Sequence, residues 1–277
     1  MNNKISAEPK AKGNALRSPS LAGMFYPEKK EELNSLLTQF FNDTVTSVTN
    51  PKGILVPHAG YIYSGRCAAV SYSKISPDFN GTFVIIAPSH QGFDTCVSDL
   101  IWETPIGSVN ADEKFIEALD IPLNNNAVCE RENSIEVQIP FIKHRFPKAS
   151  IVPILIGDQS YSGAKYAADA VISAIKRTGI TPVIIASGDG SHYVPRKKAE
   201  TDDLIVLAAL KNLDTKKFYD ALIKIQPSMC GYGCICAMAE ICKYLGAKES
   251  RVLTYQTSGD ATGDYSEVVG YISMEVV

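Results

Sequence analysis

The sequence predicts a single α/β domain, built around a parallel or mixed sheet that helices cover on both faces. Four continuous apolar runs alternate along the 277-residue chain with segments of helical periodicity. Strands buried on both faces are apolar at nearly every position, and alternation of strand with helix is typical of such sheets. No linker, repeat or low-complexity tract divides the chain, which is long enough to enclose one large core.

The apolar runs predict four central strands, at residues 53–57, 82–88, 150–157 and 181–187. Helical periodicity predicts seven helices, at residues 64–75, 112–119, 134–146, 162–177, 197–213, 215–225 and 232–245. Two late segments, "RVLTYQT" and "VVGYISMEV", are rich in β-branched and aromatic residues. We expect them to close the sheet as its last strands.

Charge and hydropathy argue against two classes of partner. The chain has 27 basic and 30 acidic residues, a formal net charge of −3, and no block of basic residues. A surface for nucleic acid or for an anionic membrane is therefore not expected. No apolar run reaches the roughly 18 residues that a membrane-spanning helix requires.

The first residues and the cysteines indicate a cytoplasmic location. The segment "MNNKISAEPKAKGNA" lacks the apolar stretch of a secretory signal, and residues 1–16 are predicted to form a flexible polar arm before a domain at 17–277. The seven cysteines are an odd number. Without an export signal, that number favours reduced thiols in the cytosol.

Three of the four histidines follow the ends of apolar runs. They stand in "ILVPHAGYIYSG" (His58), "APSHQG" (His90) and "SGDGSHY" (His192), and the last of these motifs also holds Asp189. Ligands of open α/β sheets bind at the carboxyl ends of the strands. One such histidine would most often be a hydrogen-bonded structural residue. Two of them, each directed by a proline, favour a shared site. His144, among basic residues late in a helix, is assigned no chemistry.

The "SGDGSHY" motif allows three interpretations. Asp189 could orient an imidazole or bind a metal, with His192 free for proton transfer. Asp189 could instead cap the next helix, with His192 packed on it. Ser187 and Ser191 raise the possibility of a Ser-His-Asp hydrolase, but the chain contains no "GxSxG" elbow.

Cys230 precedes a strongly apolar helix in "MCGYGCICAMAE". The exposed amides and dipole of a helix N-terminus stabilise a thiolate, so we expect a lowered pKa at this thiol. The later cysteines, Cys234, Cys236 and Cys242, are expected in the core. Two histidines and a thiolate, with a carboxylate and a third histidine nearby, suit zinc, iron or copper. Phosphate-binding loops and dinucleotide fingerprints are absent from the sequence, which disfavours nucleotide chemistry.

Taken in order, a set of motifs resembles the Memo family, whose bacterial and archaeal members are often called AmmeMemoRadiSam system protein B. The motifs are "RSPSLAGMFYP", "ILVPHAGYIYSG", "APSHQG", "ENSIEVQIPF", "SGDGSHY", "CGYG" and "SGDATGDYSEVVGYIS". The resemblance runs from Arg17 to the C-terminus. It implies an α/β/α sandwich similar to class III extradiol dioxygenases. The chain departs from the family at Asn133, where a histidine is common, and at Gly188 and Gly190, where the family tends to have "SSDxSHY".

The resemblance also implies a site. The family's metal motif falls on His58, His90 and Cys230, with Asp189 and His192 lining the same pocket as candidate catalytic residues. It implies iron or copper rather than zinc, a small molecule or peptide in the cleft, and an association with a radical-SAM protein.

We therefore expect a redox enzyme with a dioxygenase-like fold. Catechol cleavage is less expected, because Cys230 replaces or supplements the usual carboxylate ligand. A non-catalytic module that binds peptides or buffers metal is one alternative, and a zinc metallohydrolase is another.

Overall fold

The computed structural model describes residues 15–44, 46–129 and 132–277. Its centre is a mixed sheet of eight strands in the order β10-β11-β2-β8-β3-β7-β4, with β9 paired to β11. Four of the strands are parallel neighbours: β2 (Gly53–Val56), β8 (Val183–Ser187), β3 (Thr82–Pro88) and β7 (Ser150–Ile156). At the two ends of this group, β11 (Val268–Val276) pairs antiparallel with β2 and β4 (Cys96–Val97) pairs antiparallel with β7. The outermost strand, β10 (Ser250–Thr257), pairs antiparallel with β11. The predicted α/β fold with a mixed sheet is confirmed.

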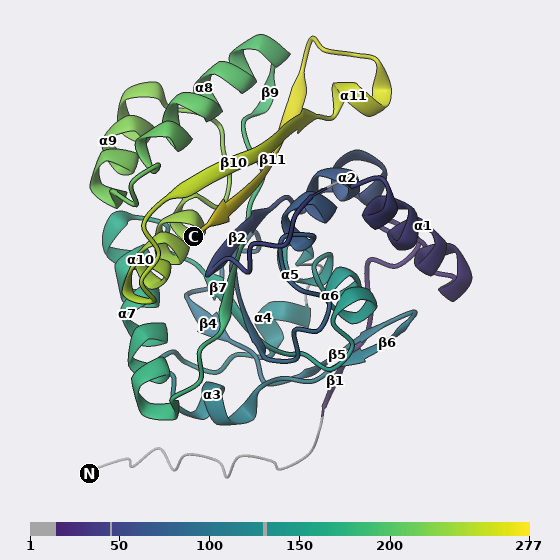
Figure 1. Cartoon of the computed structure of the whole chain (residues 1–277), viewed down its shortest axis with the longest axis vertical. Coiled ribbons are helices and arrows are strands. Elements are labelled where there is room, and N and C mark those ends of the chain that lie inside the picture. The colour runs from purple at the N-terminus through teal and green to yellow at the C-terminus, as the bar shows by residue number, and fades with distance from the viewer. Residues whose placement is uncertain (1–14, 45, 130–131) are drawn as a thin grey trace, which may run out of the picture.

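Helices cover both faces of this sheet and make an α/β/α sandwich (Figure 1). One face carries α3 (Glu113–Glu117), α7 (Tyr161–Thr178), α8 (Arg196–Ala209), α9 (Thr215–Ile225) and α10 (Tyr232–Tyr244). The other carries α1 (Lys30–Asn42), α2 (Tyr61–Tyr72), α4 (Asn126–Cys129), α5 (Asn133–Glu136) and α6 (Ile139–Arg145). Within the described residues, no helix is both long and apolar enough to cross a membrane.

The apolar runs are continuous because successive residues serve two different cores. In β3, Val84 and Ile86 pack into the core under α7 and α10, whereas Phe83 and Ile85 pack into the core under α2 and α6. Alternate side chains of a strand point to opposite faces, so a strand covered on both faces has no polar face. The four predicted central strands lie within two residues of their expected limits.

The predicted helix at 134–146 is two helices, α5 and α6, joined at Val137–Gln138. Pro140 lies in the first turn of α6. Its ring nitrogen cannot donate to the carbonyl four residues earlier, so one continuous helix through this segment would lose a hydrogen bond and meet a steric clash. α5 lies at the end of β3, where the hydroxyl of Ser134 donates to the carbonyl of Pro88 at 3.0 Å.

Several elements were not predicted. They are α1, α4, α11 (Gly259–Thr262), β4, β9 (His192–Val194) and a small separate sheet of β1 (Leu16–Arg17), β5 (Ile101–Thr104) and β6 (Gly107–Val109). The predicted arm at 1–16 falls mostly on residues 1–14, which lie outside the described residues. Leu16 belongs to β1 and pairs with Ile101.

Candidate metal centre

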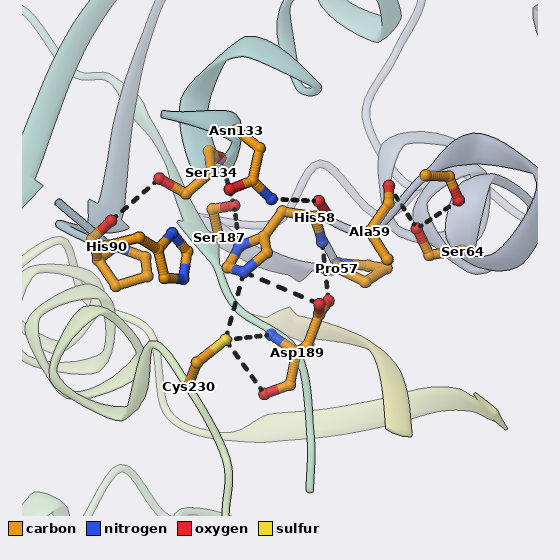
Figure 2. A network of polar contacts seen from close by, with 12 residues as sticks. Pro57, His58, Ala59, Ser64, His90, Asn133, Ser134, Ser187, Asp189 and Cys230 are labelled. Carbon is orange, nitrogen blue, oxygen red and sulfur yellow. Dashed lines mark hydrogen bonds and ion pairs between the residues drawn. The ribbon is translucent and has the colours of Figure 1, made fainter. Parts of the chain in front are cut away.

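Three loops bring His58, His90 and Cys230 together at the carboxyl edge of the sheet (Figure 2). His58 follows β2 by two residues and His90 follows β3 by two. Cys230 stands two residues before α10. One ligand atom from each of these three side chains lies within 4.8 Å of the others. This is a separation over which a single metal ion can reach all three, at bond lengths of about 2.0–2.3 Å.

The hydrogen bonds of His58 fix which ring nitrogen is free. Its Nδ1 lies 3.1 Å from Ser187 Oγ. The Ser187 hydroxyl donates its only hydrogen to the carbonyl oxygen of Ser134, at 2.6 Å, and accepts from Gln138 Nε2 at 3.1 Å. Nδ1 of His58 must therefore be the donor, and Nε2 carries the lone pair. Burial, with the nearby charge of His90, lowers the pKa of His58 to about 3, so the ring is neutral.

The ring of His90 is oriented in the same way, by Glu132. Nδ1 of His90 lies 2.8 Å from one carboxylate oxygen of Glu132, and the backbone amide of His90 donates to the other at 2.7 Å. Because a carboxylate only accepts, Nδ1 carries hydrogen and Nε2 is left for a ligand. Burial would raise the pKa of Glu132, but the hydrogen bonds from His90 and Ser134 outweigh it and hold the pKa below its usual value.

Glu132 is a residue of the site that sequence reasoning missed. It is fully buried and accepts four hydrogen bonds, two from His90 and two from the backbone and hydroxyl of Ser134. Glu132 belongs to the "ENSIEVQIPF" motif, but nothing in the sequence places it beside a histidine 42 residues away. The pairing also raises the pKa of His90, chiefly through the hydrogen bond to Glu132.

The expectation of a lowered pKa at Cys230 is wrong. Burial, with the negative charge of Asp189 close by, raises the pKa of this thiol well above its ordinary value. Among the described residues, no amide of α10 donates a hydrogen bond to the sulfur. It instead accepts from the backbone amide of Asp189 at 3.2 Å and lies 3.2 Å from Nε2 of His58. Without metal, the thiol therefore keeps its hydrogen and directs it at the free lone pair of His58.

Asp189 faces the same cleft. One of its oxygens accepts from the backbone amide of His58 at 2.8 Å, and the other lies 3.8 Å from Nε2 of that ring. Burial raises the pKa of Asp189 to about 6, against the lowering effects of that hydrogen bond and of the nearby histidines. The capping interpretation is wrong, because α8 begins after Pro195 with no side-chain cap.

His192 lies at the start of β9 and is half-buried. Among the described residues its Nε2 has no hydrogen-bond partner, although this atom is shielded from solvent. The backbone of His192 is held by Ser228, whose hydroxyl accepts from the amide and donates to the carbonyl, each at 2.7 Å. Asp189, His192 and Cys230 form a second group whose ligand atoms lie within 4.8 Å of one another. Burial lowers the pKa of His192.

The loop that carries Asp189 and His192 is anchored by Asp203 of α8. The buried carboxylate of Asp203 accepts from the amide of Ser191 at 2.9 Å, from its hydroxyl at 2.7 Å and from Tyr255 at 2.8 Å. A Cβ atom on Gly190 would lie 2.2 Å from this carboxylate, so the close approach requires glycine there. Ser191 is thus a structural partner rather than a nucleophile.

Ser187 is equally unsuited to nucleophilic attack. It is fully buried, and its hydrogen is committed to the carbonyl of Ser134. Asn133, the residue found where the family often has histidine, donates from Nδ2 to the carbonyl of His58 at 2.9 Å. Its amide therefore holds the His58 loop instead of adding a ligand.

A cleft of about 520 Å³ opens over these residues. Four of its lining residues are aromatic: Phe25, Tyr63, Tyr193 and Tyr271. Tyr193 is 74% exposed and has a φ of +56°, a left-handed conformation that costs an aromatic residue free energy. None of the described residues that line the cleft is Lys or Arg. Its walls are therefore better suited to a neutral, partly apolar ligand than to a polyanion.

The N-terminal motif contributes one wall of the cleft. Arg17 forms a buried ion pair with Glu136 of α5, which also accepts from the amide of Leu21 at 2.8 Å and from the hydroxyl of Tyr26 at 2.6 Å. The carbonyl of Phe25 accepts from the amide of Tyr61 at 2.8 Å. These bonds fix the segment that places Phe25 at the cleft.

The remaining histidine and cysteines lie outside the site. His144 stacks on Phe41 with ring centroids 5.9 Å apart. As predicted, Cys234, Cys236 and Cys242 are buried in the core along α10.

Comparisons with known proteins agree with the motifs. Residues 17–275 match a family model described as Memo-like protein. A MEMO1 family protein of Methanocaldococcus jannaschii is 38% identical, over 94% of this chain and 98% of its own length. Proteins with the same description from Archaeoglobus fulgidus and Thermoplasma volcanium are 38% and 36% identical, over 92% and 94% of this chain and 97% of each relative.

Proposed function

This chain belongs to the Memo family, and from that premise we propose that it is a metal-dependent redox enzyme acting on a small ligand in the cleft. The observation that carries the proposal is the direction of the free lone pairs. Hydrogen bonds at Nδ1 leave Nε2 as the nitrogen that carries the lone pair when the rings of His58 and His90 are neutral, and the sulfur of Cys230 lies within 4.8 Å of a ligand atom of each.

The residues fit an iron or copper ion better than a hard, oxygen-seeking ion. Imidazole suits copper, iron and zinc, and thiolate favours softer ions. Three protein ligands leave a coordination position free. A bound redox-active ion would supply electron transfer and a place for a ligand to coordinate.

Residues of the chain would transfer protons and orient the ligand. Asp189 and His192 stand beside the three ligands and face the cleft, where His192 can take a proton from a ligand or return one. Asp189 would favour the protonated imidazole in that exchange. The aromatic walls would exclude water and orient a small molecule or an apolar peptide side chain. A cytoplasmic setting, in which Cys230 stays reduced, and an association with a radical-SAM protein belong to the same proposal.

A metal-buffering or peptide-binding module is the second candidate. The neutral thiol of Cys230 against the lone pair of His58 is a site where a metal ion exchanges with a proton, which is sufficient for reversible storage. In this case the cleft would hold a ligand without changing it.

Anaerobic purification followed by metal analysis and an O2-consumption assay distinguishes the redox enzyme from the metal-buffering or peptide-binding module. The enzyme proposal predicts about one iron or copper per chain and O2 uptake that Cys230→Ser abolishes. Cys129→Ser is the matched control, because Cys129 is an exposed thiol outside the site. Metal without turnover across a panel of small aromatic and thiol substrates would favour the buffering module. Zinc with ester or amide hydrolysis would replace both by a metallohydrolase.

A further inference from the structure

Cys230 belongs to two groups of potential ligands at once. It shares one with His58 and His90 and the other with Asp189 and His192, and within each group the ligand atoms lie within 4.8 Å of one another. The two groups have only the sulfur in common. They therefore mark two adjacent positions for an ion, each next to the same sulfur atom.

Two potential ligand atoms of the group formed by Asp189, His192 and Cys230 have no hydrogen-bond partner among the described residues. One oxygen of Asp189 is used by the amide of His58, which leaves the other, 3.8 Å from the His58 ring, without a hydrogen bond among the described residues. Nε2 of His192 is shielded from solvent and also unpaired there. A buried polar atom without a partner is destabilising, so its presence beside a carboxylate and a thiol requires an explanation.

We propose that the cleft binds a second divalent transition-metal ion on Asp189, His192 and Cys230, so that the sulfur bridges two ions. The proposal rests on the first ion position proposed above. Two ions bound to one sulfur at about 2.3 Å each can lie about 3.5–4 Å apart, the spacing of two-metal sites. Carboxylate, imidazole and thiolate together form a borderline donor set, which suits iron(II), cobalt(II) or zinc(II).

Charge permits this occupancy. The thiolate of Cys230 and the carboxylates of Asp189 and Glu132 supply three negative charges at or next to the centre. Two divalent ions then leave one positive charge, which a hydroxide ion or an anionic ligand at the free positions can neutralise. With only the first ion bound, Glu132 and Cys230 already balance its charge, and Asp189 and His192 remain available for proton exchange.

The second ion therefore changes the task of Asp189 and His192. When His192 is a ligand, its lone pair is committed and it cannot accept a proton. Single occupancy would leave the proton-transfer pair active, and double occupancy would suspend it. The cleft would thus respond to the concentration of free metal.

Anaerobic titration of the metal-free protein with cobalt(II) tests this directly. Absorbance of the sulfur-to-cobalt charge-transfer band gives the stoichiometry, and electron paramagnetic resonance reports magnetic coupling between two ions that share a sulfur. We expect two ions per chain, a loss of the uncoupled signal as the second binds, and a return to one ion in His192→Ala. His144→Ala, a histidine outside the cleft, should keep both ions.

Three results would contradict the second ion position or the proposed function. Saturation at one ion per chain would overturn the second position and leave the first intact. Two ions without magnetic coupling, or two ions still bound by His192→Ala, would place the second ion elsewhere and overturn the proposal. No bound ion at all would overturn the proposed function itself.

Discussion

The sulfur of Cys230 lies 3.2 Å from Nε2 of His58, and the thiol hydrogen is directed at the nitrogen lone pair that a metal ion would use. In the metal-free protein, the ring of His58 and the thiol of Cys230 are both neutral. Burial lowers the pKa of His58 to about 3 and raises that of the thiol. Metal binding at this pair is therefore an exchange of a proton for a cation.

That exchange predicts the pH dependence of metal affinity. Because the free thiol is protonated at neutral pH, binding releases about one proton, and Kd should fall about tenfold for each unit of rising pH. At a pH below the raised pKa of His90, this ring must also lose a proton before it can bind metal. The plot of log Kd against pH should therefore be steeper in that acidic range. Calorimetry in buffers of different ionisation enthalpy measures the number released. Binding without proton release would contradict the neutral thiol.

Asp189 is predicted to destabilise the metal-free protein at neutral pH. Its folded pKa of about 6 lies above the ordinary value of 3.8, so between these values the native state binds more protons than the unfolded state. Stability then falls as pH rises, by up to about 3 kcal/mol in total above pH 6.

Asp189→Asn should therefore raise the melting temperature of the metal-free protein at pH 7.5 and change it little at pH 3.5. Its amide oxygen can still accept from His58. Thermal unfolding of both proteins at the two pH values is the measurement. A lower melting temperature for the variant at pH 7.5 would show that the folded protein stabilises the charged form of Asp189, which would contradict its raised pKa.

Glu132→Gln should weaken metal binding about 10- to 100-fold, the usual cost of losing a partner that orients a ligand. Glutamine has one acceptor oxygen where Glu132 satisfies four donors, so the His90 ring loses its fixed orientation. Glu117→Gln, an exposed change, is the control.

Metal affinity is measured per folded molecule, together with the 15N shifts of the His90 ring. A variant that melts earlier but binds metal with wild-type affinity and an unchanged tautomer would show that Glu132 only stabilises the fold.

Gly190→Ala should destabilise the protein by about 1–3 kcal/mol, the range of overpacking, because the new methyl group meets the carboxylate of Asp203 at 2.2 Å. It should also displace Asp189 and His192. Gly60→Ala is the comparison, since a Cβ there meets nothing closer than 3.6 Å. Denaturant unfolding measures the free energy of unfolding of both variants. Equal stability would mean that the side chain of Asp203 moves aside at little cost.

Much of the fold could be predicted because the central strands are apolar on both faces and end at prolines or small residues. The same rule predicted that His58, His90 and Asp189 would meet, since parallel strands end at one edge. The helix α1 was also visible in principle: Leu33, Leu37 and Phe40 recur at helical spacing and are buried.

The parts that sequence could not supply depend on contacts between distant segments. Glu132 looks like any acidic residue until the fold brings it to His90. At Cys230, burial and the charge of Asp189 dominate the pKa of the thiol, and neither can be read from the helix that follows in the sequence. The unpaired Nε2 of His192 is likewise a property of packing, not of the motif.

His58 and Cys230 are 172 residues apart in the chain, and this separation sets the order of events during synthesis. At about 5–20 residues per second, the sulfur leaves the ribosome roughly 10 to 30 seconds after the histidine. Throughout that interval a nascent chain exposes imidazoles without the thiol that completes the centre. On the proposed function, all three ligands could hold an ion only after Cys230 has emerged, and loading would depend on the metal supply that the nearly complete chain meets.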